Sequence, residues 1–164
     1  MDHSSQPDAI FQGRRYFPIS QYFRKRFGER VAKISVSIAE TCPNRSPNSS
    51  MEACVFCDDW GSAAYHLEKD RELIDQIRHN KKLVSRRLKC KQFLVYFQSY
   101  TNTLDKIKIL QQRFETALSE EYVSGLVVGT RPDCLPERIF PLLNDMCQKS
   151  YVLVEIGAQS FFND

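Results

Sequence analysis

Apolar residues recur along the chain with two different periods, and the two patterns alternate. Residues 33–39 place Ile34, Val36 and Ile38 at every second position, between serines, which predicts a β-strand. Residues 104–118 instead space their apolar side chains three or four positions apart, the pattern of an amphipathic helix. The same patterns predict further strands over 92–97, 125–129 and 152–156 and further helices over 20–30, 69–87 and 136–147. Thr103 is placed to cap the helix after it, and Pro136 to open the last helix.

Strands that alternate with helices, and that are apolar on both faces, favour a parallel sheet with helices outside. The fold class is therefore α/β, and the pattern alone fits both an open doubly wound sheet and a section of a barrel. Residues 1–30 read as an extension with one short helix, and residues 31–164 as the sheet-forming domain. The strand over 152–156 is followed by no covering helix, so we expect the chain to be the front part of a longer protein.

Charge and cysteine content narrow the functional classes. The formal net charge of +3 is small, and the basic runs over 14–30 and 78–91 fit solvated helix faces better than a nucleic-acid surface, although RNA stays open as a weak alternative. No apolar run approaches the roughly 20 residues that span a bilayer, and the polar N-terminus lacks the apolar core of a signal peptide. We therefore expect a cytoplasmic protein without membrane contact, whose six cysteines serve as ligands, catalysts or core residues rather than disulfides.

A cysteine-rich loop over 41–61 follows the first predicted strand. Cys42, Cys54 and Cys57 have the spacing C-x11-C-x2-C, and their soft thiolates suit an iron–sulfur cluster or zinc. Three thiolates on a four-iron cluster leave one iron open, whereas a structural zinc site takes four ligands and would need another residue, for which His66 is the candidate. Spacing alone leaves both metals open. The placement suggests function, because active sites of α/β proteins lie at the carboxyl ends of strands.

Five ordered phrases resemble one known family. They are CPNR at 42–45, CVFC at 54–57, YFQSYTNT at 96–103, GTRPDC at 129–134 and VEIGAQS at 154–160. Together they resemble the YhcC/YtqA-like radical-SAM proteins, relatives of the radical-SAM domain of the Elongator catalytic subunit. The resemblance runs from about Tyr16 to the last residue. The chain departs from the family pattern at residues 46–48 and 52–53, where the family usually carries Asp-Gly-Thr and glycines, but it keeps the ligand spacing.

The resemblance implies a fold, a cofactor pair and an enzyme class. The fold would be a partial (βα)6 barrel, of which residues 31–164 supply the N-terminal part with about four strands. Cys42, Cys54 and Cys57 would hold a [4Fe–4S] cluster that cleaves S-adenosylmethionine to a 5′-deoxyadenosyl radical, with electrons from a donor such as a flavodoxin or ferredoxin. Because further strands are implied, we do not expect this chain alone to turn over its unknown substrate. A tRNA-modifying radical-SAM domain and a zinc-stabilised binding module without catalysis are the alternative hypotheses.

The resemblance also suggests contacts to S-adenosylmethionine, although it assigns no catalytic residue. These contacts are Phe56, Tyr100, Thr101, Asn102, Arg131, Glu155 and Gln159. Arg131 would pair its planar fork with the methionine carboxylate, with an ion pair to Asp133 or Glu155 as the alternative. Glu155 lies in an apolar strand, where a charge is costly unless it is paired, so a site is favoured there. Cys90, Cys134 and Cys147 are expected to be small core residues, and of these only Cys134 lies near the predicted site.

Overall fold

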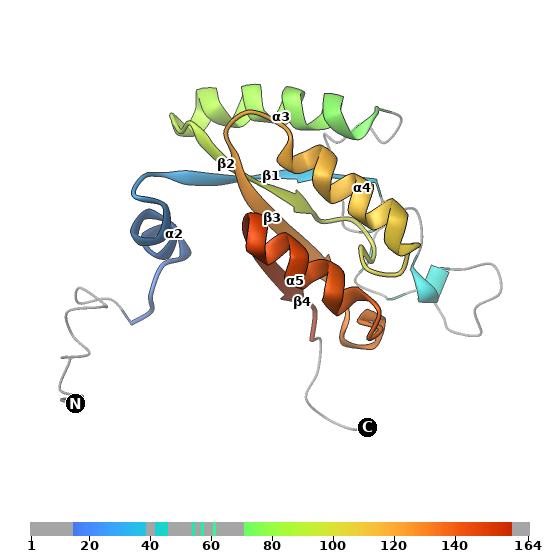
Figure 1. Ribbon diagram of the computed structural model, residues 1–164. Helices are drawn as coiled ribbons and strands as arrows, with labels where there is room; N and C mark the ends of the chain where they lie inside the picture. Colours follow the sequence, from blue (N-terminus) through green and yellow to red (C-terminus); the bar gives the residue numbers. More distant parts are fainter. Residues whose placement is uncertain are drawn as a thin grey trace. The chain divides into compact units, whose positions relative to one another are not determined.

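The computed structural model describes residues 15–38, 42–45, 54, 57, 61 and 71–158 (Figure 1). The elements run in the order α2 (Ile19–Phe27), β1 (Val31–Val36), the 3-10 turn η1 (Pro43–Arg45), α3 (Leu73–Leu88), β2 (Gln92–Phe97), α4 (Ile107–Leu118), β3 (Val123–Thr130), the 3-10 turn η2 (Pro132–Cys134), α5 (Ile139–Lys149) and β4 (Tyr151–Ile156). The predicted alternation of strands and helices is confirmed, and every predicted strand and helix is present.

The chain divides into two compact units, one ending at Val31 and the other beginning at Ala32. In the first unit, α2 has Phe23 buried, and the ring of Phe27 lies edge-on to it at 6.1 Å. The helix ends where Gly28 takes a left-handed backbone with φ of 77°, and the Gly28 N–H bonds to the carbonyl of Arg24 at 2.9 Å. The predicted helix therefore stops three residues short of Arg30, because Gly28 adopts this conformation without strain.

The second unit is built on a parallel sheet whose four strands lie in the order β1-β2-β3-β4. Each crossover leads to the next strand in the same direction, and right-handed crossovers of this kind place every helix on the same face. Figure 1 shows α3, α4 and α5 on one side of the sheet. A doubly wound sheet would have helices on both faces, so the arrangement is consistent with a partial βα barrel.

One hydrophobic core fills the space between the sheet and these helices. Alternate residues of each strand face it, and Ile34, Val95 and Leu126 are all at most 1% exposed. Phe97 of β2 and Phe114 of α4 meet in a T-shaped contact with ring centroids 5.3 Å apart. Because successive strand residues point to opposite faces, the residues between these core positions lie on the face that the helices leave open.

Two predicted helix starts were wrong. Thr103 does not cap α4, which begins at Ile107 after Lys106, because the Thr103 hydroxyl bonds instead to the Cys134 carbonyl and lies 2.6 Å from the Thr130 hydroxyl. Pro136 does not open α5, since residues 137–138 form a turn and the Pro136 carbonyl accepts a bond from the N–H of Ile139 at 2.9 Å. Both residues shape the loops before these helices.

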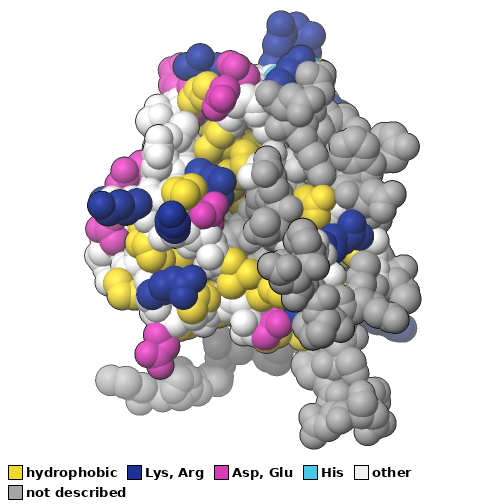
Figure 2. All heavy atoms as spheres, turned by 90° about the vertical axis from the view of Figure 1, so that its right-hand side faces the viewer, with side chains coloured by type: hydrophobic (Ala, Val, Ile, Leu, Met, Phe, Trp, Pro, Cys, Tyr) yellow, Lys and Arg dark blue, Asp and Glu magenta, His cyan; other side chains and the backbone are white. Residues whose placement is uncertain are grey.

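The surface carries both signs of charge. On the face shown in Figure 2, basic and acidic side chains are interspersed around apolar ones. The basic run over 78–91 is partly neutralised at its start, because Glu120 pairs with Arg78 at 3.0 Å and with Lys81 at 3.1 Å. Within the described ranges, no helix combines the length and apolar character needed to cross a bilayer.

Phe114 offers a direct test of the core. Replacing Phe114 with Ala should lower the free energy of unfolding by about 3–5 kcal/mol, because it leaves a cavity against Phe97. Urea denaturation followed by circular dichroism measures this. The matched control is Phe140→Ala on α5, where the side chain is 52% exposed and little should be lost. Equal losses in the two variants would contradict the packing described here.

Candidate functional site at the carboxyl edge of the sheet

A cavity of about 730 Å³ opens at the carboxyl ends of the strands. Its walls come from the loop after β1, from residues that end or follow β2 and β3, and from the end of β4. A volume of this size can hold a cofactor and part of a substrate. Cys42, Cys54 and Cys57 all line it, so the structure brings the three predicted ligands to one cavity at the predicted edge.

Local backbone bonds shape the cysteine loop where it is described. The N–H of Arg45 bonds to the carbonyl of Cys42 at 2.9 Å, which closes the η1 turn, and the N–H of Cys57 bonds to the carbonyl of Cys54 at 3.0 Å. The Arg45 guanidinium then donates to the Cys57 carbonyl at 2.7 Å and joins the two halves of the motif. None of the three cysteines is in a disulfide, and all three are half-buried.

The arrangement of the thiols bears on which metal they fit. Among the described residues, no three His, Cys, Asp or Glu side chains are grouped closely enough to hold a single metal ion. An iron–sulfur cluster separates its thiolates more widely than one ion does, because each sulfur binds a different iron. Three thiols on one open cavity are a donor set that a four-iron cluster can take, with one iron left open. His66, the fourth ligand of the zinc hypothesis, lies outside the described residues.

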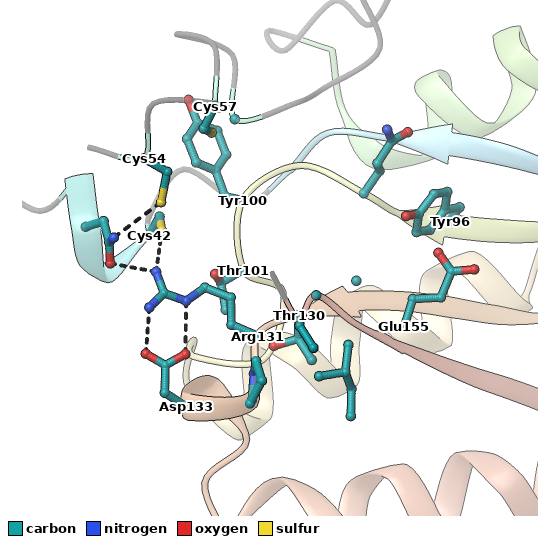
Figure 3. A pocket seen from close by; sticks show the side chains of 18 residues that line it. Cys42, Cys54, Cys57, Tyr96, Tyr100, Thr101, Thr130, Arg131, Asp133 and Glu155 are labelled. Carbon is teal, nitrogen blue, oxygen red and sulfur yellow. Dashed lines mark hydrogen bonds and ion pairs between the residues drawn. The ribbon is translucent and has the colours of Figure 1, made fainter. Parts of the chain in front are cut away.

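Arg131 connects the end of β3 to the cysteine loop (Figure 3). Its Nε and Nη2 donate to the two carboxylate oxygens of Asp133 at 2.9 and 2.7 Å, the ion pair foreseen as one alternative. Its Nη1 donates to Asn44 Oδ1 at 2.6 Å and to Cys42 Sγ at 3.7 Å. Hydrogen bonding to Asp133 raises the pKa of the guanidinium, and Arg131 in turn lowers the pKa of the Asp133 carboxyl.

The residues after β2 form a tight turn beside the cavity. Tyr100 has a φ of 56°, and its N–H bonds to the carbonyl of Gly61 at 3.0 Å. A Cβ on Gly61 would lie 2.6 Å from the Tyr100 ring, so this close approach requires glycine. The Asn102 side-chain amide donates to the carbonyls of Phe97, Ser99 and Gly129 at 3.0–3.2 Å. Asn102 thus fixes β2 to β3, while its predicted contact to the cofactor stays a prediction.

Thr101 shows a feature typical of a ligand site. It lines the cavity, it is only 3% exposed, and its Oγ1 is buried without a hydrogen-bond partner of good geometry. It makes a weak hydrogen bond to the sulfur of Cys134, a poor acceptor, which opposes the rise in the pKa of that thiol. Burial, followed by the charge of Asp133, raises the pKa of that thiol to about 11, so Cys134 stays protonated. A buried hydroxyl with so little to bind is costly unless a ligand supplies the partner.

The open face of the sheet carries a polar cluster, which we call the Lys33 cluster: Lys33, Tyr96 and Glu155. Lys33 forms an ion pair with Glu155, and its Nζ lies 4.9 Å from the centre of the Tyr96 ring. Gly129 pairs with Glu155 in register, and a Cβ there would lie 3.1 Å from the Phe97 carbonyl oxygen. Burial and a hydrogen bond to Glu155 raise the pKa of Tyr96 to about 12. Glu155, whose charge was predicted to need a partner, therefore has two partners, Lys33 and Tyr96.

Sequence reasoning missed several of these residues. In the sequence, Asn44 and Tyr96 stood out only as members of the motifs at 42–45 and 96–103, and Lys33 was assigned no role. A lysine inside a predicted strand is the same signal that singled out Glu155, so Lys33 could have been found in that way. Phe56 and Gln159, two further predicted contacts, lie outside the described residues.

Comparisons with known proteins find relatives that align with most of the chain. The chain is 31% identical over 147 residues to the uncharacterized protein YtqA of Bacillus subtilis, which covers 90% of this chain and 46% of YtqA. It is 34% identical over 137 residues to the protein YhcC of Escherichia coli K12, and 30% identical over 158 residues to the uncharacterized protein MJ0486 of Methanocaldococcus jannaschii. These alignments cover 83% and 93% of this chain and 43% and 47% of the two relatives, respectively.

The chain is related to YtqA and YhcC. It spans about half the length of the curated relatives it matches. No protein-family model and no solved structure matches it. The names of these relatives state no activity, so the comparisons establish kinship alone.

The Lys33 cluster predicts an unusual tyrosine titration. Tyr96 should stay protonated to about pH 12, and Glu155→Gln should bring its pKa back toward 10, because the variant removes the carboxylate that stabilises the phenol. Tyrosine-selective carbon NMR measures this, with Tyr96→Phe to assign the signal. The pKa is raised on folding, so this contribution to stability is complete below pH 10 and is lost as the pH rises through 12. An unchanged Tyr96 pKa in Glu155→Gln would contradict the assigned bond.

Proposed function

We propose that this chain carries the cluster-binding part of a radical S-adenosylmethionine enzyme, with Cys42, Cys54 and Cys57 as the ligands of a [4Fe–4S] cluster. The observation that carries the proposal is that three cysteines, none of them in a disulfide, line one open cavity together with Thr101, whose hydroxyl is buried. Kinship to YtqA and YhcC over most of the chain supports it. Three ligands leave one iron free to bind a small molecule.

When bound, the cluster would supply an electron, received from a flavodoxin or ferredoxin, that breaks a carbon–sulfur bond of S-adenosylmethionine and gives a 5′-deoxyadenosyl radical. The residues of this chain would bind S-adenosylmethionine, orient it and shield it from solvent. The hydroxyl of Thr101, which is buried in the wall of the cavity, would bond to a polar group of the cofactor. At the other end of the cavity, Glu155 accepts hydrogen bonds and suits the hydroxyls of a ribose or of the substrate (Figure 3). The turn built by Asn102 and Gly61 holds this wall in place.

Metal content is the first test. Protein reconstituted without oxygen should be brown, with iron matched by acid-labile sulfide, and Cys42→Ala, Cys54→Ala or Cys57→Ala should abolish both. The matched control is Cys147→Ala on α5, which should keep the full iron content, because Cys147 does not line the cavity. Cys147 is exposed, so the expectation that it is a core residue was wrong for it and right for Cys90 and Cys134. Stoichiometric zinc without iron uptake would refute the cluster, and loss of that zinc on His66→Ala would establish the zinc hypothesis in its place.

Cofactor binding by Thr101 is a separate test. Thr101→Val keeps the shape of the side chain and removes the buried hydroxyl, so S-adenosylmethionine should bind at least tenfold more weakly to the cluster-loaded protein while the iron content stays the same. Calorimetric titration of the loaded protein measures this. Thr116→Val, on α4 and outside the cavity, is the matched control. Equal affinity in Thr101→Val and the parent would remove Thr101 from the cofactor site.

A further inference from the structure

Two of the three cysteine sulfurs accept N–H groups from one connected pair of side chains. Asn44 Nδ2 donates to Cys54 Sγ at 3.3 Å, and Arg131 Nη1 donates to Cys42 Sγ at 3.7 Å. The donors are themselves joined, because the same Nη1 donates to Asn44 Oδ1 at 2.6 Å. Figure 3 shows this chain of contacts running from the sulfurs to the end of β3.

Asp133 fixes the orientation of this pair. It takes the Nε and Nη2 edge of the Arg131 guanidinium in a bidentate pair, and so the Nη1 edge faces the cysteine loop. The Arg131 side chain is 26% exposed and that of Asp133 is 55% exposed, so the carboxylate forms the outer end of the chain of contacts. Four of the five guanidinium N–H groups are thereby used within the protein.

This use of the guanidinium bears on the cofactor contact predicted for Arg131. A carboxylate of a bound ligand would have to displace Asp133 to obtain the same two-pronged pairing. The bonds to Asn44 and Cys42 need no such exchange. The observed contacts therefore support a role for Arg131 that acts through the cysteine sulfurs and does not require a bound carboxylate.

We propose that Arg131 and Asn44 are positioning residues that raise the reduction potential of the cluster held by Cys42, Cys54 and Cys57, an inference that rests on the proposed function. An N–H donor to a ligating sulfur stabilises negative charge there, and it stabilises the reduced state more because that state carries one more negative charge. The guanidinium adds a permanent positive charge. Asp133 opposes part of that charge, so it lowers the potential while it holds Arg131 in place.

Because Arg131 and Asp133 carry charges of opposite sign, removing each charge should shift the reduction potential in opposite directions. The midpoint potential is measured by redox titration of the reconstituted chain, followed by electron paramagnetic resonance, with no S-adenosylmethionine present. Arg131→Gln should lower the potential, with the one-electron equilibrium constant for reduction falling about tenfold, or about 59 mV. Asp133→Asn should raise the potential, because Arg131 then acts on the sulfurs with its full charge. Asn44→Ala should lower it, through loss of the bond to Cys54 and of the acceptor for Arg131.

Arg113→Gln is the matched control, because Arg113 also pairs with an aspartate, Asp105 at 2.8 Å, and lies on α4 outside the cavity that the cysteines line. Its potential should equal that of the parent. A purely structural role for Arg131 would reduce the iron content without shifts of opposite sign. If Arg131→Gln takes up no iron, the inference is tested by the directions in which Asp133→Asn and Asn44→Ala shift the midpoint potential.

Two outcomes separate this inference from the proposed function. Full iron content with unchanged potentials, or with shifts of one sign in both Arg131→Gln and Asp133→Asn, overturns the inference alone. A parent chain that takes up no iron under the same conditions overturns the proposed function, and the inference with it.

Discussion

The direction in which the sheet is wound decides what the rest of this structure can do. Four parallel strands follow one another in order, so right-handed crossovers place α3, α4 and α5 on one face, and all of the main hydrophobic core lies there. The other face is thereby released from packing helices. Polar residues such as Lys33 and Glu155 can occupy it, and the loops at the carboxyl edge can meet over one cavity.

Arg131 links the cysteine loop to the hydrogen-bonded sheet. The loop itself has little regular structure where it is described, with only the short η1 turn at residues 43–45. β3, in contrast, is hydrogen-bonded on both sides and buried over residues 125–130. Because Arg131 follows β3 directly, its position is set by the sheet, and its bond to Asn44 gives the loop a fixed reference point. A loop that presents metal ligands needs such support from neighbouring side chains.

The alternation of strands and helices could be predicted from the sequence, because each element buries one set of side chains at a fixed period. The edge at which the cysteines lie followed from the loop's place after the first strand. The partners of individual polar groups could not be predicted. Thr103 looks like a helix cap in the sequence, yet its hydroxyl binds across to the next strand's loop. The pairing of Lys33 with Glu155 depends on the register of four strands, which no local pattern specifies.

The ion pair between Lys33 and Glu155 joins residues 122 positions apart. At a synthesis rate of about 5–20 residues per second, Lys33 leaves the ribosome roughly 6–24 s before its partner. For the first part of that time, until β2 is made, β1 has no neighbouring strand, and such edges invite association with other chains. An ammonium group that has no partner yet discourages this pairing, since burying it would be costly. The lysine that pairs with Glu155 in the folded sheet thus also discourages pairing of β1 with other chains before β2 is made.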